Sequence, residues 1–197
     1  LQPNAELGDV LFVDNNGDGK LNESDKCMIG NPIPDVIYGF NVGMAWKGFD
    51  LSLQFGGTLG NEVFNAMRLY TYYPNDITNK DRALLNYWTP DNKDTNIPRL
   101  TDADVNDNDR ISDRYVESGS YLRLRNAQIG YTLPSSVAKK MKMQNVRFYI
   151  SGQNLFTISN YSGLDVEVGQ SSSLSRGIDY GIYPQSITFT GGINVTF

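Results

Sequence analysis

The stretch of twelve residues from Asp14 to Asp25 is the part of the chain whose residue types and spacing best fit a ligand site. Gly19 stands at its sixth position, where a calcium loop turns sharply, and Lys20 at the seventh offers a backbone carbonyl. Carboxylate, amide and carbonyl oxygens are the ligands that Ca²⁺ prefers. We therefore predict a structural Ca²⁺ site with these ligands: Asp14, Asn16, Asp18, Lys20, Asn22 and Asp25.

One residue departs from the usual calcium loop. Asp25 takes the twelfth position, where a longer, bidentate Glu is usual. The segment before the loop, 11–13, favours a strand, and Pro32 and Pro34 follow the loop, so a helix–loop–helix sensor is not expected. A metal-free turn of the same outline remains the alternative.

No catalytic constellation accompanies this loop, and we do not expect an enzyme. The chain contains no His, which removes the commonest general base and zinc ligand. Its one cysteine, Cys27, excludes an internal disulfide. We find no nucleophile elbow and no Walker loop. The acidic run 101–110 is interpreted as a solvated loop.

Composition indicates one substantial globular domain. The 197 residues carry a formal net charge of -5, with 40% hydrophobic and 20% charged residues, which excludes general disorder and a basic nucleic-acid binder. No apolar run approaches the roughly 20 residues that a membrane-spanning helix needs. Aromatic residues make up 12% of the chain and Gly numbers 19, which is typical of a β-rich protein with tight turns.

Period-two alternation predicts five strands, at about 36–46, 49–58, 121–133, 145–156 and 187–197. In the terminal strand every second residue is apolar or Gly: Ile187, Phe189, Gly191, Ile193, Val195 and Phe197. The opposite faces of the strands are mostly Gly, Ser, Thr, Asn and Gln. A soluble sheet usually carries Lys and Glu on its wet face, so this pattern favours a membrane barrel.

Short and long connections alternate between these strands. They span about 2, 60, 11 and 25 residues in chain order. In an antiparallel meander this places all short links at one end, as in an outer-membrane barrel, and aromatics gather there: Trp46, Phe49, Tyr131 and Phe197. Within the long connection, 61–72 and 81–88 have helical spacing. The alternative is a soluble, secreted, calcium-stabilised β-sandwich that binds carbohydrate, since a sandwich alternates too.

Strict alternation also places Arg123 and Arg125 on the apolar face, with Ala127 and Ile129. They lie towards the long-loop end. We therefore consider two roles for them, a polar rim and contact with lipid phosphates at the outer leaflet.

Several segments together resemble the C-terminal part of SusC/RagA-type TonB-linked outer-membrane proteins, in order and over essentially the whole chain. They are Gly8–Lys20, Ile29–Asp35, Tyr38–Phe40, Trp46–Leu51, Tyr87–Pro90, Tyr121–Asn126, Gly130–Pro134, Ser151–Phe156, Tyr161–Asp165 and Gly177–Pro184. The resemblance implies a 22-stranded β-barrel in the cell outer membrane, contacting its lipid and occluded by an N-terminal plug. Such proteins import oligosaccharides, less often peptides, with energy from TonB and a SusD-like surface lipoprotein as lid.

On this resemblance the chain supplies the last five antiparallel strands of the barrel. The expected parts are an extracellular loop with the calcium-like motif (1–35), a hairpin (36–58), a long extracellular loop (59–120), a strand pair (121–156), a further extracellular loop (157–183) and the closing strand (184–197). The plug and the part that contacts TonB are expected outside this chain.

Two further sets of residues are candidate sites. Aromatics of the long loop could stack on sugars or contact the lid, or form the loop's own small core: Tyr70, Tyr72, Tyr73 and Trp88. Apolar residues of the terminal strand are expected to act as a signal for the barrel-insertion machinery, as in other such barrels: Phe189, Ile193, Val195 and Phe197.

Overall fold

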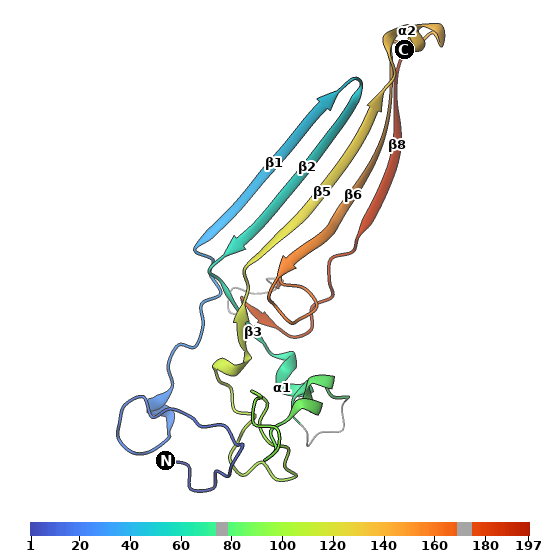
Figure 1. Ribbon diagram of the computed structural model, residues 1–197. Helices are drawn as coiled ribbons and strands as arrows, with labels where there is room; N and C mark the ends of the chain where they lie inside the picture. Colours follow the sequence, from blue (N-terminus) through green and yellow to red (C-terminus); the bar gives the residue numbers. More distant parts are fainter. Residues whose placement is uncertain (74–78, 169–174) are drawn as a thin grey trace.

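Five long strands form one antiparallel sheet in the computed structural model, which describes residues 1–73, 79–168 and 175–197 (Figure 1). They are β1 (Val36–Trp46), β2 (Phe49–Leu59), β5 (Tyr121–Thr132), β6 (Asn145–Ser159) and β8 (Thr188–Thr196). The order in the sheet is β1-β2-β5-β6-β8, and every neighbouring pair is antiparallel. The five strands expected from alternation are confirmed, with β6 three residues longer than expected.

The connections divide the sheet into two unlike ends. The β1–β2 link is the two-residue turn Lys47-Gly48, with positive φ at both residues (46° and 89°), as a tight hairpin requires. The β5–β6 link holds the short helix α2 (Ser135–Lys140). Figure 1 shows both links and the C-terminus at one end of the strands, and the longer connections and the N-terminus at the other. We call these the short-turn end and the loop end.

A second, smaller sheet lies at the loop end. It consists of β4 (Val116–Ser118), β3 (Glu62–Asn65) and β7 (Ile178–Asp179), in that order. The helix α1 (Met67–Thr71) follows β3, and short 3-10 helices cover Glu23–Asp25, Arg82–Asn86 and Asp113–Tyr115. The helix expected over 61–72 is therefore wrong in its first half: Phe64 pairs with Val116 and Ile178, so contacts distant in sequence override the local spacing. The expected helix at 81–88 is a 3-10 turn.

The register places the apolar side chains of the large sheet on one face. Near the short-turn end Phe49 lies opposite both Trp46 and Tyr131, Tyr131 lies opposite Phe148, and Phe148 lies opposite Ile193. The rings of Phe49 and Tyr131 are 4.5 Å apart between centroids. The row of facing residues runs across all five strands, so the face is continuous.

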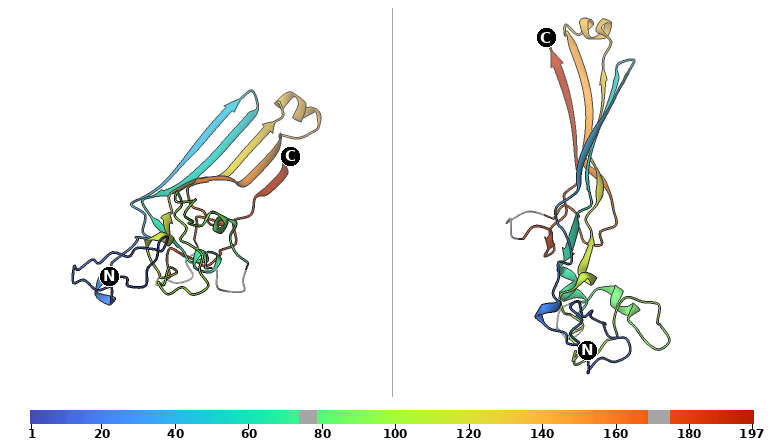
Figure 2. Two further views of the ribbon diagram at one scale, coloured as in Figure 1. Left: turned by 60° about the horizontal axis from the view of Figure 1, so that its bottom comes forward. Right: turned by 90° about the vertical axis from the view of Figure 1, so that its left-hand side faces the viewer.

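This apolar face is exposed. Trp46 is 69% exposed, Ile150 62% and Phe189 72%. Figure 2, right, shows the strands edge-on as a single layer, with no second sheet of the described residues packed against them. The sandwich alternative is therefore wrong, because a sandwich buries this face against another sheet.

The buried core lies mainly at the loop end. Its members there include Val63, Ala66, Leu84, Ile97 and Tyr115, each 7% exposed or less. The long connection thus folds on itself instead of trailing from the strands. Within the described parts of the chain, no helix is both long and apolar enough to cross a membrane.

Candidate functional site

The loop end is assembled from two regions that lie far apart in the sequence. The Asp9 carboxylate accepts from Arg99 Nε at 2.7 Å, and the amide of Arg99 donates to the carbonyl of Gly8 at 2.9 Å. The amide of Val10 donates to Asn108 Oδ1 at 2.8 Å. Burial opposes ionisation of Asp9, but Arg99, the Glu6 amide and Asn108 together outweigh it, and the pKa of this carboxyl is lowered. The N-terminal segment and the long connection therefore form one unit, which sequence patterns did not indicate.

A hollow of about 770 Å³ opens where these two regions meet. Aromatic rings and guanidinium groups share its lining: Tyr72, Trp88, Tyr115, Arg68 and Arg114, with the amides of Asn86 and Asn96. The Arg68 guanidinium lies over the Tyr72 ring at 5.0 Å. Flat apolar rings beside hydrogen-bond donors are what a ligand with both polar and apolar faces requires.

The position of Trp88 depends on Gly8. A Cβ atom built on Gly8 would lie 2.3 Å from the indole ring, and Gly8 has φ of +91°, a conformation that favours glycine. The amide of Trp88 donates to the carbonyl of Ile97 at 3.0 Å. The backbone of Trp88 is thus fixed within the long connection itself, while its ring lines the hollow.

The structure brings together two of the four candidate aromatics at this hollow. Tyr72 and Trp88 line it. Tyr72 and Tyr73 line a second cavity of only about 30 Å³, beside Leu84. Tyr70 lies on α1, is 55% exposed, and lines neither space.

The predicted calcium loop is closed by its own hydrogen bonds. Asp14 accepts from the amides of Gly17 (2.7 Å) and Gly19 (2.9 Å), and the Gly19 amide is the main reason that the pKa of Asp14 is lowered. Asp25 accepts from the amides of Asn15 (3.0 Å) and Asn22 (2.8 Å), which ties the two ends of the loop together. Asp25 is shorter than the usual Glu at the twelfth position, but it is long enough to accept hydrogen bonds from amides near both ends of the loop.

The remaining expected ligands lie in the same loop. Asn16 Oδ1 accepts from the Asp18 amide at 2.9 Å, Asp18 accepts from the Lys20 amide at 2.8 Å, and Asn22 Oδ1 accepts from the Ser24 amide at 2.8 Å. Over the described ranges, no group of three or more His, Cys, Asp or Glu side chains is arranged to hold a metal ion. A cation here would therefore need amide and carbonyl oxygens as well as carboxylates.

A buried ionic network joins β5 to the loop between β6 and β8. Arg123 Nη2 lies 2.5 Å from Asp165 and Arg123 Nη1 lies 2.6 Å from Glu167; the Arg123 and Asp165 side chains are each 4% exposed. Arg125 Nη2 also binds Glu167, at 2.5 Å, and the Tyr121 hydroxyl donates to the same carboxylate. The sequence did not predict that these residues form one network; for Arg123 and Arg125 it suggested a polar rim or contact with lipid phosphates.

The network corrects the placement of the two arginines. The register of β5 shifts between Leu124 and Asn126, and this bulge moves Arg123 to the polar face of the sheet. Arg125 Nε lies 2.7 Å from a Cβ built on Gly56, a residue of that same face. The proposed contact of the arginines with outer-leaflet phosphates is therefore wrong, because their charges are directed into the loop.

Three further hydrogen bonds hold the described part of this loop. Asp165 accepts from the amides of Gln185 and Glu167, both at 2.9 Å. Burial would raise the pKa of Asp165, but these amides and Arg123 lower it. The Tyr161 hydroxyl donates to the buried Asp179 at 2.5 Å, and its pKa is raised, first by burial and then by that carboxylate.

The terminal-strand candidates share the apolar face at the edge of the sheet. Val195 lies opposite Val146, Ile193 opposite Phe148, and Phe189 opposite Gly152. Phe189, Ile193, Val195 and Phe197 are 72%, 61%, 40% and 80% exposed.

Comparisons with known proteins add sequence and fold relatives. No family model matches the chain. The chain is 38% identical over its full length to TonB-dependent receptor P3 of Formosa agariphila and covers 20% of that protein. Over 95% of the chain it is 31% identical to TonB-dependent receptor SusC of Bacteroides thetaiotaomicron, covering 17% of it.

Solved structures agree. The chain superposes on a structure described as the RagAB peptide transporter with a TM-score of 0.76 and 30% identity, over 90% of this chain and 19% of that one. The RagAB peptide importer in its closed-closed state gives 0.73 and 28%, over 91% of this chain and 20% of that one. The chain thus spans about a fifth of the length of the relatives it matches. It belongs to the SusC/RagA type of TonB-dependent receptors and represents a fragment of their β-barrel.

Proposed function

We propose that the five-stranded sheet is part of the outer-membrane wall of a TonB-dependent importer. The observation that carries this proposal is the continuous apolar face, exposed across five strands and backed by a polar, largely uncharged face. In a barrel wall the apolar face contacts lipid and the polar face lines the lumen. In this function the chain positions a substrate and catalyses no reaction.

The imported substrate is proposed to be an oligosaccharide, with a peptide as the alternative. Tyr72 and Trp88 offer ring faces in the hollow, and sugars stack on such faces. The solved relatives are described as peptide transporters, and this favours the alternative. The proposed partners are a SusD-like lipoprotein lid over the loop end and TonB acting through a part of the receptor outside this chain.

The test uses the full receptor with its lid protein. Trp88→Ala and Tyr72→Ala are compared with Tyr70→Ala, an exposed aromatic that lines neither cavity. Binding is measured on an array of glycans and, separately, with a mixture of tryptic peptides. Loss of glycan binding in the first two variants alone supports the proposal. Unchanged glycan binding in all three variants would show that the hollow does not bind glycans. Loss of peptide binding alone in Trp88→Ala and Tyr72→Ala would favour the peptide alternative.

We also propose that the loop 14–25 holds a structural Ca²⁺. Its oxygen donors lie in one closed loop, and the lowered pKa of Asp14 keeps that carboxylate ionised. The ion would brace the loop without taking part in import.

The apolar residues of β8 are proposed to guide barrel assembly, together with Phe197. All four side chains are exposed, three on the edge strand β8 and Phe197 directly after it, where a further strand or the insertion machinery can reach them. Phe197→Ala in the full receptor is expected to lower the amount of receptor in the outer membrane. Normal surface levels would contradict this role.

A further inference from the structure

The two ends of the sheet differ sharply in charge. The short-turn end, defined as residues 44–50, 130–148 and 194–197, contains five basic residues and one acidic residue: Lys47, Lys139, Lys140, Lys142, Arg147 and Asp50. The chain has 17 basic and 22 acidic residues in total, which leaves 12 basic and 21 acidic residues elsewhere. An acidic protein therefore carries a local excess of positive charge at this end.

The single acid does not neutralise the lysines. Asp50 is paired with Arg147, whose guanidinium makes two contacts with the carboxylate across the intervening strand β5. Lys47, Lys139, Lys140 and Lys142 are all exposed. Their charges are available to a ligand outside the described residues.

Two of these lysines, Lys139 and Lys140, lie on helix α2, and Lys142 lies in the turn that follows it. Ala138 is fully buried, and its carbonyl accepts from the amides of Met141 and Met143, both at 3.0 Å. Val137 and Met141 are 42% and 50% exposed beside the lysines. Figure 1 shows α2 beyond the ends of the strands, at the tip of the short-turn end.

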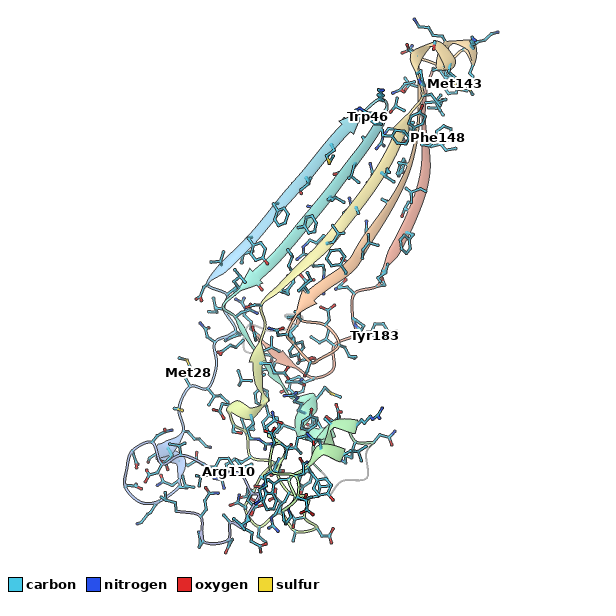
Figure 3. All side chains as sticks on the ribbon, in the orientation of Figure 1. Met28, Trp46, Arg110, Met143, Phe148 and Tyr183 are labelled. Atoms are coloured by element: carbon cyan, nitrogen blue, oxygen red, sulfur yellow. The ribbon has the colours of Figure 1, made fainter. Side chains whose placement is uncertain are left out.

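The apolar face leads directly to this basic turn. Figure 3 shows Trp46, Phe148 and Met143 together near the short-turn end. Trp46 is 69% exposed, and the Lys47 ammonium lies 4.9 Å from its ring centre. Aromatic rings followed by lysines are what a membrane interface accommodates: the rings sit at the headgroup level, and the lysine stems lie on the apolar part while their ammonium groups reach the phosphates.

We propose that Lys47 and the three lysines of the α2 turn bind the phosphates of anionic phospholipids in the leaflet at the short-turn end. The charge complementarity and the continuity with the apolar face point to a lipid headgroup, since lysines near a membrane surface attract anionic lipids. This inference rests on the proposed function, because it needs the sheet to span a membrane. The lipid contact lies at the short-turn end, whereas the hollow proposed to bind the substrate lies at the loop end.

The experiment uses the full receptor in nanodiscs of phosphatidylcholine with a minority of phosphatidylglycerol. The variant is Lys139→Gln, Lys140→Gln and Lys142→Gln together. The matched control makes the same change at three exposed basic residues of the loop end, Lys26, Arg82 and Lys93. Lipids retained by the receptor are counted by native mass spectrometry.

The wild type and the control are expected to retain phosphatidylglycerol several-fold above its share of the bilayer. The α2 variant is expected to lose this enrichment. Equal enrichment in the variant, or loss in the control as well, would overturn the proposal. It would also be overturned if inorganic phosphate in neutral nanodiscs stabilised the receptor as strongly as phosphatidylglycerol does. A receptor that does not enter nanodiscs at all would instead contradict the proposed function.

Discussion

Arg123 on β5 and Asp165 in the β6–β8 loop lie 2.5 Å apart, and both side chains are 4% exposed. They are 42 positions apart in the sequence. The pair therefore ties a loop to the polar face of the sheet, where a barrel wall borders its lumen.

Replacing Arg123 by Met is expected to free the loop. The change leaves Asp165 buried without its cation, and breaking a buried pair in this way costs about 3–5 kcal/mol. Limited proteolysis of the folded receptor should then cut within the β6–β8 loop. Arg125→Met should have a smaller effect, because that side chain is 42% exposed. Equal resistance of wild type and Arg123→Met would contradict the role of the pair.

Acid is expected to release the same loop at low pH. The pKa of Asp165 in the folded protein lies below its ordinary value of 3.8, so its stabilising contribution is complete above that value. It is lost as the pH falls through the lowered folded pKa. The protection factors of the loop amides, which correct hydrogen exchange for its intrinsic pH dependence, should stay constant from neutral pH down to about pH 4 and fall below it. Loosening between pH 5 and 7 would show that another group controls the loop.

The strands could be predicted from the sequence because their alternation is local. The turn at Lys47-Gly48 and the facing pair Trp46 and Phe49 follow directly from that pattern. The face of the sheet on which Arg123 lies could not be predicted, because one extra residue at a bulge reverses the alternation on the far side of the bulge.

Other features depended on distant partners. Phe64 joins a strand because Val116 and Ile178 lie beside it, although its own segment has helical spacing. The sequence indicates Trp88 as a candidate only by its residue type. Its support by Gly8 required the fold, because that contact joins the N-terminal segment to the long connection.

A side chain at Gly130 is expected to disturb the ion pair between Arg147 and Asp50. A Cβ there would lie 2.5 Å from Arg147 Nη2 and 2.6 Å from Asp50 Oδ1, so it would displace the ion pair that crosses β5. Gly130→Val should reduce the amount of folded receptor, measured as loss of the heat-modifiable band on gels. The matched control is Gly43→Val on the same face, where no described atom lies within 4 Å of the added Cβ. Equal losses for both variants would contradict the specific role of Gly130.

Calcium is expected to stabilise the receptor through the loop 14–25. Added Ca²⁺ should raise the thermal unfolding midpoint relative to EDTA, and Asp18→Ala should abolish the shift. Asp94→Ala removes an exposed carboxylate from another loop and should leave the shift intact. If no shift occurs, or if Asp18→Ala keeps it, the loop is a metal-free turn.

The central claim is that one face of the sheet contacts lipid and the other does not. Single cysteines are placed at Leu51 and Leu53, and at Ser52 and Gln54 between them, after Cys27→Ser removes the exposed native thiol. Each cysteine carries a fluorophore, and the full receptor is reconstituted with lipids that bear a nitroxide quencher on the acyl chain. The account predicts strong quenching at 51 and 53 and weak quenching at 52 and 54. Equal quenching at all four positions, or the reverse order, would contradict it.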